Sequence, residues 1–168
     1  TRLRTADSHT GRKPHDKFIV RDGPSENTIW WDNNKAMTRS HFQVLKQDFL
    51  VHARNSNLFI QDLIAGADPR HELPTRVICE NAWHALFIQH LLIAPPAHET
   101  FVPGLTIIDL PSFRADPKRH GTNSQTVTAI DLANGPVLIG STTYPGELKN
   151  AGFRGRNFLR TEQGWRPV

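Results

Sequence analysis

Short apolar runs alternate with longer amphipathic segments along this chain. Five of these runs have the length and residue types of β-strands, at residues 18–20, 58–65, 105–110, 125–132 and 136–140. The nearly continuous apolar character of residues 105–110 indicates a strand that is buried on both faces. Asn134 and Gly135 are typical of a tight turn, so they favour a hairpin between the last two strands.

Two longer segments have the pattern of helices. The first follows Thr38 or Ser40, either of which can cap it. Its apolar face carries Phe42, Leu45, Phe49 and Leu50, while Lys46 and Asp48 face outward. The second is the apolar stretch 77–93, with Thr75 as N-cap and a stop at Pro95-Pro96; its polar interruptions predict a buried helix rather than a membrane span. Strands with two packed helices predict a mixed α/β domain.

Length and cysteine content narrow the class of protein. The 168 residues are enough for one domain with a real hydrophobic core. Cys79 is the single cysteine, which excludes an internal disulfide and suits a reducing compartment. No secretory signal is visible, and the chain begins at Thr1, as a cleaved organellar presequence or simple trimming would leave it. We therefore expect an intracellular protein of the mitochondrial matrix or cytoplasm, with the organelle preferred.

The net charge of +4 is unevenly distributed. Residues 1–21 and 149–168 each carry a net charge of +4, and the body between them carries −4. Basic ends suit contact with anionic partners, although solvated tails would have the same composition. The tail 151–168 also interleaves aromatic residues with arginines, so a nucleic-acid-associated subunit stays open as an alternative.

The run from His9 to Asp22 contains a candidate anion site. Gly11 and Pro14 flank Arg12 and Lys13, and these two residues hold the arginine at a tight corner. A guanidinium fixed in this way can grip a carboxylate with two parallel hydrogen bonds. A surface arginine in a basic segment is the alternative.

Several further motifs follow in a fixed order. They are the aromatic-acidic turn at residues 30–35, the strand and turn at 58–68, and the segments 76–84, 105–113 and 137–149. Together with Thr10-Gly11-Arg12-Lys13-Pro14, this series resembles ATP-dependent phosphoenolpyruvate carboxykinase, whose arginine segment typically reads Thr-Gly-Arg-Ser-Pro-x-Asp-Lys. The resemblance implies that residues 1–150 form a carboxykinase N-terminal-like domain, an α/β lobe with a mixed twisted sheet and packed helices. Residues 151–168 would be a basic, diverged C-terminal tail.

The resemblance also assigns candidate site residues. It implies that Arg12 and Tyr144 bind the substrate and that Lys149 is the first lysine of the family's Lys-Lys pair. Asn150 replaces the second, metal-binding lysine, and an amide is a poor substitute for that nitrogen ligand. The family's phosphate loop and its other metal ligands are not found in the sequence. We therefore expect no bound cofactor, and ATP with Mn²⁺ or Mg²⁺ only if a separate nucleotide domain completes the site.

These features predict a degenerate carboxykinase domain, a pseudoenzyme that is not catalytic by itself. We expect it to act as a structural or binding subunit of a larger protein assembly, with Arg12, Tyr144 and Lys149 as remnants of a gluconeogenic, lyase-type site that can still hold a small anion. The first alternative is a fragment of an active carboxykinase, which converts oxaloacetate and ATP to phosphoenolpyruvate, ADP and CO₂. Nine histidines without a cysteine pair do not predict a zinc site.

Overall fold

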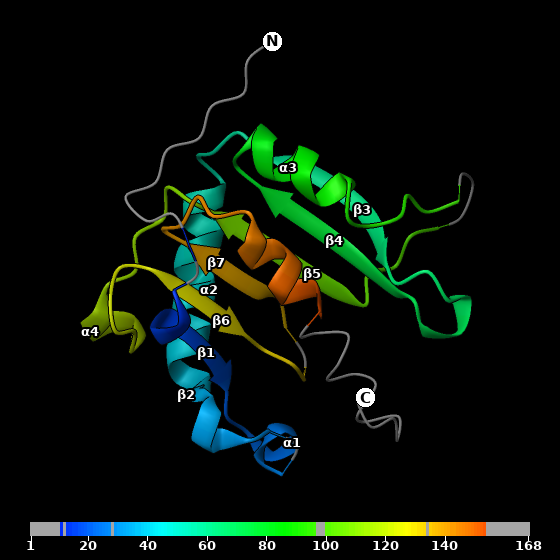
Figure 1. Cartoon of the computed structure of the whole chain (residues 1–168). Helices are drawn as coiled ribbons and strands as arrows, with labels where there is room; N and C mark the ends of the chain where they lie inside the picture. The colour runs from blue at the N-terminus through cyan, green and yellow to red at the C-terminus, as the bar shows by residue number, and fades with distance from the viewer. Residues whose placement is uncertain (1–10, 12, 28, 97–99, 134, 154–168) are drawn as a thin grey trace.

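The computed structural model describes residues 11–153, apart from 12, 28, 97–99 and 134. Its centre is a seven-stranded mixed sheet with the strand order β2-β1-β6-β7-β5-β4-β3 (Figure 1). The strands are β1 (Lys17–Val20), β2 (Lys35–Met37), β3 (Phe59–Ala65), β4 (Leu73–Cys79), β5 (Leu105–Leu110), β6 (Val127–Ile130) and β7 (Val137–Gly140). The predicted α/β class and mixed sheet are confirmed.

The strand directions divide the sheet into parallel and antiparallel parts. β1 runs parallel to both β2 and β6, and β5 runs parallel to both β4 and β7. The β6–β7 and β3–β4 pairs are antiparallel. The C-terminal end of β7 therefore lies at the same edge of the sheet as the N-terminal ends of β1 and β6.

Helices cover both faces of the sheet (Figure 1). Helix α2 (Arg39–Ala53) packs on one face through Phe42, Leu45 and Phe49, which are completely buried. On the other face, α3 (Ala82–Gln89) and a helical segment at residues 146–153 share one apolar cluster with β4, β5 and β7. The remaining helices are short: α1 (Gly23–Glu26), α4 (Pro117–His120) and the 3-10 turns η1 (Pro14–Asp16), η2 (Trp31–Asn33) and η3 (Pro69–His71).

The prediction for the first long helix is confirmed in outline. Thr38 is its N-cap and accepts a hydrogen bond from the His41 backbone N–H. Three predicted positions differ. Leu50 is 44% exposed and so lies off the buried face, and Lys46 and Asp48 are half-buried rather than directed outward. The helical period alone does not decide which side of such bordering positions faces the protein.

The prediction of one buried helix through residues 77–93 is wrong. The structure has strand β4 over Leu73–Cys79 and the shorter helix α3 over Ala82–Gln89, with Asn81 rather than Thr75 as the N-cap. Thr75 is buried in the strand. Burial along β4 alternates residue by residue, which is the period of a strand. A short apolar run does not distinguish a buried strand from a buried helix, and β4 and α3 follow one another closely enough to look like one helix.

Candidate functional site

One edge of the sheet brings together segments that are far apart in the sequence. Register pairs Val127 with Gly140 and Lys17 with Thr128, so the chain entering β1 lies beside the chain leaving β7. We call this region the site edge, and it consists of residues 13–17, 126–128 and 141–149. It contains the described part of the Gly-Arg corner and the whole Tyr-x-Gly-Glu-x-Lys segment.

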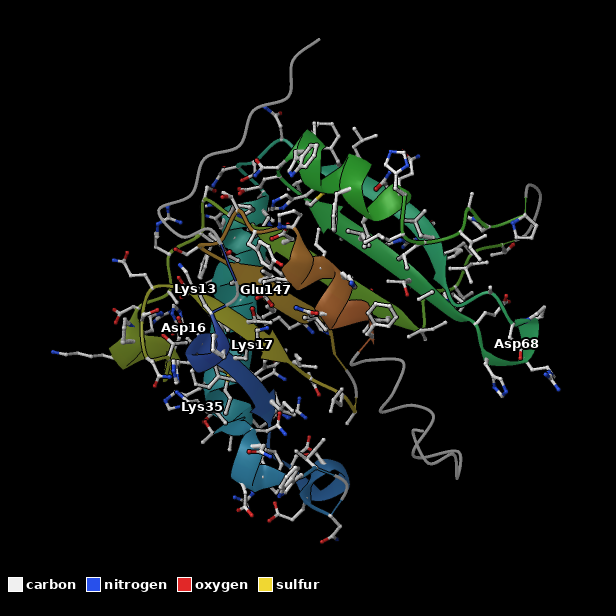
Figure 2. All side chains as sticks on the ribbon, in the orientation of Figure 1. Lys13, Asp16, Lys17, Lys35, Asp68 and Glu147 are labelled. Carbon is white, nitrogen blue, oxygen red and sulfur yellow. The ribbon has the colours of Figure 1, made fainter. Side chains whose placement is uncertain are left out.

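An ion pair joins these two segments. The Lys17 Nζ lies 2.8 Å from Glu147 Oε2, and the two side chains are only 11% and 4% exposed (Figure 2). Both carboxylate oxygens of Glu147 are buried and accept no hydrogen bond of good geometry from the described part of the chain, so the contact with Lys17 is an ion pair only. A buried oxygen without a donor costs free energy. Among the described residues, the charge of Lys17 offsets part of this cost.

Lys13 adds a second link across the site edge. Its Nζ donates a hydrogen bond of 2.9 Å to Thr126 Oγ1, which in turn donates to the Ser141 carbonyl at 3.3 Å. Ser141 has a φ of 59°, a left-handed conformation that is costly for residues other than glycine. The loop after β7 is thus held in a strained conformation from the β1 side.

The aromatic-acidic turn reaches the same edge. A hollow of about 440 Å³ opens beside Lys17. Its lining residues come from the entry to β1 and from the turn before β2: Pro14, His15, Lys17, Asp32, Asn33, Asn34 and Lys35. Lys35 donates to the His15 carbonyl at 2.8 Å, which fixes its ammonium group over this hollow (Figure 2). Two motifs that are separate in the sequence therefore line one hollow, which carries the charges of Lys17, Asp32 and Lys35 and is joined to the third motif through the Lys17–Glu147 ion pair.

The predicted site residues have different positions in the structure. Tyr144 is half-buried in the loop after β7, and its ring packs over Gly146, where an added Cβ would lie 2.7 Å from the Tyr144 Oη. Lys149 is exposed on the helical segment 146–153, with its Nζ 5.9 Å from the centre of the Phe153 ring. Asn150 follows it and is half-buried. Arg12 lies outside the described residues, between Gly11 and Lys13.

Behind the site edge, a buried histidine supports the loop that carries Tyr144. His84 on α3 contacts the carboxylate of Asp109 on β5 through Nδ1 and the Thr143 carbonyl through Nε2, the latter at 3.0 Å. Burial opposes the charge on His84, but the hydrogen bond and negative charge of Asp109 outweigh it and raise the pKa of the imidazole. Burial likewise raises the pKa of Asp109.

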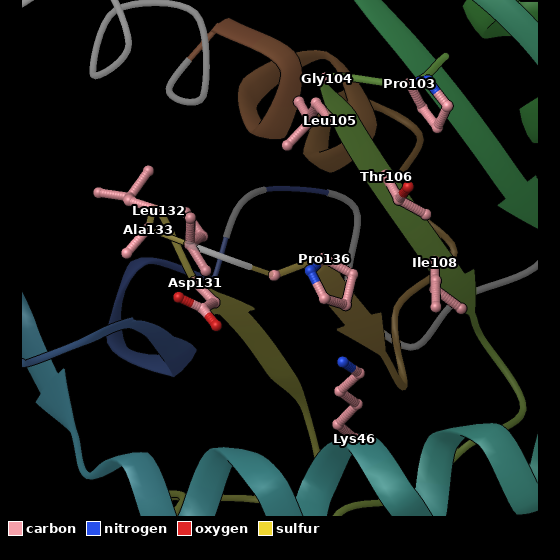
Figure 3. Close-up of a pocket in the computed structure, with 12 residues that line it drawn as sticks. Lys46, Pro103, Gly104, Leu105, Thr106, Ile108, Asp131, Leu132, Ala133 and Pro136 are labelled. Atoms are coloured by element: carbon pink, nitrogen blue, oxygen red, sulfur yellow. The ribbon is translucent and has the colours of Figure 1, made fainter. Parts of the chain in front are cut away.

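Another pocket, of about 490 Å³, lies at the opposite edge of the sheet (Figure 3). Lys46 from α2 and Asp131 after β6 line it together with apolar side chains of β5 and β6. None of the described site candidates Tyr144, Lys149 and Asn150 lines this pocket. Its position therefore gives no support to the chemistry that the motifs predict.

Comparison with known proteins agrees with the order and placement of these motifs. A sequence model of the phosphoenolpyruvate carboxykinase family, ATP type, matches residues 2–168. The chain belongs to this family. It is 57% identical over 162 residues to phosphoenolpyruvate carboxykinase (ATP) of Rhizobium rhizogenes, and 55% identical to the proteins of the same name from a Chelativorans species and Rhizobium meliloti. Each match covers 95% of this chain and 30% of the relative.

The chain thus corresponds to an N-terminal fragment of a carboxykinase, spanning about 30% of the length of these relatives. The family match reaches residue 168, beyond the last of the motifs, which ends at residue 149. Most of the basic tail 151–168 lies outside the described residues, so its proposed contacts stay predictions. The relatives named here are bacterial and give no support to an organelle; the compartment also stays a prediction.

The resemblance to the family implies a divalent metal in the reaction. In the part of the chain that the structure describes, no three histidine, cysteine, aspartate or glutamate side chains are grouped to hold a metal ion. The resemblance implies that Asn150 occupies a lysine position of the family signature. Cys79 is buried, and burial raises the pKa of its thiol to about 12. We therefore derive no chemical step through a metal held by these residues.

Four residues of the site were not singled out by sequence pattern: Lys17, Glu147, His84 and Asp109. Lys17 and Glu147 stand inside motifs that the sequence does show, so their positions in those motifs were an available signal. For His84 and Asp109 the signal was a polar residue within an apolar segment, which burial alone explains equally well.

The described residues contain no helix with the length and apolar character of a membrane span.

Proposed function

We propose that this chain provides the dicarboxylate-binding side of a phosphoenolpyruvate carboxykinase site and does not transfer a phosphoryl group by itself. The observation that carries the proposal is the buried Lys17–Glu147 ion pair, which joins the Gly-Arg corner segment to the Tyr-x-Gly-Glu-x-Lys segment. These are the two segments whose resemblance to the family concerns the substrate.

The charges at the site edge suit a small dianion. Lys13 and Lys35 come from the same end of the sheet as Lys17, whose charge is balanced by Glu147, and Arg12 precedes Lys13 in the sequence. Cations held by fixed hydrogen bonds stabilise carboxylate and enolate charge without having to reorganise. In this proposal Arg12 and Tyr144 contact oxaloacetate, and Lys149 faces the side from which the phosphate would come.

The second half of the proposal depends on Asn150. An amide side chain offers a weak oxygen ligand where the family signature has a lysine nitrogen, so a catalytic metal would be bound poorly. We propose that ATP and Mn²⁺ or Mg²⁺ bind only in a complex that includes a nucleotide-binding domain. Within such an assembly the chain would be a binding or structural subunit. The alternative is a fragment of a working carboxykinase.

A chimera separates these alternatives. The region of the Rhizobium rhizogenes relative that aligns with this chain is replaced by residues 2–168, and formation of phosphoenolpyruvate from oxaloacetate and ATP is measured. We expect turnover at least about a hundredfold below that of the relative, with oxaloacetate binding retained. Restoring the lysine with Asn150→Lys should recover at least tenfold of the lost rate.

The control is Lys118→Met in the same chimera, because Lys118 is an exposed lysine on α4, outside the site edge. It should leave both binding and turnover unchanged. Full activity of the unmodified chimera would overturn the non-catalytic proposal and favour the working fragment. Loss of oxaloacetate binding in a folded chimera would overturn the binding role.

A further inference from the structure

We propose that His84 and Asp109 are positioning residues that hold the peptide group between Thr143 and Tyr144, and thereby set the place of Tyr144. The consequence for substrate rests on the proposed function, in which Tyr144 contacts a dicarboxylate. The positioning of the loop is independent of that function.

His84 and Asp109 lie in the interior of the protein. The His84 side chain is 0% exposed and the Asp109 side chain is 1% exposed. Asp109 stands near the C-terminal end of β5, in the centre of the sheet, and His84 stands in the first turn of α3. An ionisable pair in such surroundings is costly, and its removal in favour of apolar residues is often neutral or stabilising. Fold stability alone is therefore a weak reason for this pair.

The pair reaches the Tyr144 loop through one peptide unit. The Thr143 carbonyl accepts from His84 Nε2 at 3.0 Å, and the Tyr144 backbone N–H donates to Thr142 Oγ1 at 3.2 Å. These two backbone atoms belong to the same planar peptide. Because both of its polar atoms are held, the orientation of the plane is fixed, and with it the position of the Tyr144 Cα.

The hydrogen bond from His84 to the Thr143 carbonyl is kept in either protonation state of the His84–Asp109 pair. A carbonyl oxygen can only accept, so Nε2 of His84 carries a hydrogen. The remaining proton lies between Nδ1 and the Asp109 carboxylate, and either location leaves the Nε2–H bond to Thr143 intact. The raised pKa of His84 agrees with a ring that keeps its protons. The loop is thus tied to the sheet through a contact that does not depend on which partner holds the shared proton.

The composition of the chain allows a direct test by NMR. Tyr144 is the single tyrosine and Met37 the single methionine, so ¹³C labelling of these two residue types gives one reporter at the site and one in the core. Met37 is buried on β2, at the far end of the sheet order from β4 and β5. The variants are His84→Gln and Asp109→Asn in the full 168-residue chain. The matched control is His90→Gln, an exposed histidine at the C-cap of the same helix.

We expect both variants to shift and broaden the Tyr144 ring signals while the Met37 methyl signal keeps its folded position. The affinity for oxaloacetate should fall about tenfold, as expected for a displaced contact residue. His90→Gln should change neither reporter. Unchanged Tyr144 signals in the folded variants would overturn the proposal. So would loss of the folded Met37 signal in both, because the pair would then hold the fold rather than the loop.

The two readouts distinguish this inference from the proposed function. If the Tyr144 signals move but wild-type protein binds no oxaloacetate, the positioning role stands and the substrate assignment fails. If oxaloacetate binds and both variants retain wild-type affinity, Tyr144 signals and Met37 signal, the positioning role fails and the proposed function stands.

Discussion

The two edges of the sheet hold their charges in different ways. At the site edge, Lys17 and Glu147 form an ion pair whose side chains are at most 11% exposed, and His84 and Asp109 lie directly behind it. At the opposite edge, where β1, β2 and β6 end, Arg39 bridges Asp22 and Asp131, and its side chain is 34% exposed. One edge buries both partners of each pair, and the other lets its arginine reach water.

The difference has a physical meaning. Burying two charges costs more than their attraction returns unless the geometry is very good, whereas a half-exposed arginine keeps much of its hydration. A fold has little reason to collect two buried ion pairs in one place for stability alone. We therefore expect the function to lie at the site edge, whereas the Arg39 bridges at the opposite edge join neighbouring strand ends.

The largest expected effect is at the site edge. Glu147→Gln leaves the Lys17 ammonium buried without its counter-charge, and it should reduce the free energy of unfolding by about 3 kcal/mol. The double variant Lys17→Met with Glu147→Leu removes both charges and should regain most of that loss. Urea unfolding of the three proteins measures both numbers. Equal stability of the single and double variants would contradict the account of a buried pair.

The corresponding change at the opposite edge should have a smaller effect. Arg39→Met removes charged hydrogen bonds to Asp22 and Asp131. The Asp22 side chain is 20% exposed and can be hydrated, and Asp131, which is 3% exposed, keeps a further interaction. We expect a loss of about 1.5 kcal/mol in the free energy of unfolding and unchanged affinity for oxaloacetate. Urea unfolding and calorimetric titration test the two parts. A loss as large as that of Glu147→Gln would remove the contrast between the edges.

A surface pair between α2 and α4 provides a pH-dependent reference. The hydrogen bond from Arg119 lowers the pKa of Asp48 to about 2, against the effect of burial, and His120 adds to the shift. A lowered pKa means that the stabilisation is complete above the unfolded value near 4 and is lost as the pH falls toward 2. Asp48→Asn should cost about 1 kcal/mol at pH 7, after allowance for solvent screening, and most of that cost should be gone near pH 2. Unfolding curves at both pH values would show a constant difference if the charge were irrelevant.

The smallest effect should be a gain. Ser141 holds a φ of 59° at the site edge, a conformation that glycine adopts at no steric cost. Ser141→Gly should therefore raise the free energy of unfolding by about 0.5 kcal/mol, since relief of the strain exceeds the added flexibility of the unfolded chain. Thermal unfolding detects such a gain. A loss of stability would indicate that the serine hydroxyl contributes more than the strain costs.

The sequence predicted much of the fold because its strands are short and distinct. The strand over Leu105–Leu110 and helix α2 with its Thr38 cap follow from residue pattern alone. The segment 73–93 failed because an alternating strand and a short helix follow one another within one apolar stretch. The pairing of β4 with β5 decides between a strand and a helix at residues 73–79, and the local residue pattern does not predict that pairing.

The candidate site was predictable only in part. Tyr144 and Lys149 could be named because they stand in a motif, but their partners are set by the sheet order. Lys17 contacts Glu147 because β6 lies between β1 and β7 in the sheet. The residue pattern of a single segment does not predict such a strand order. His84 reaches Thr143 for the same reason, since α3 and the loop after β7 become neighbours only in the folded sheet.

The central claim is that the site edge binds a small dicarboxylate, and calorimetric titration of the wild-type chain with oxaloacetate tests it most directly. Pyruvate, which lacks the second carboxylate, is the matched ligand, and Lys118→Met is the matched variant. We expect saturable binding of oxaloacetate, at least tenfold weaker binding of pyruvate, and at least tenfold weaker binding of oxaloacetate to Arg12→Met. Equal affinities for both ligands, or a wild-type affinity in Arg12→Met, would contradict the account.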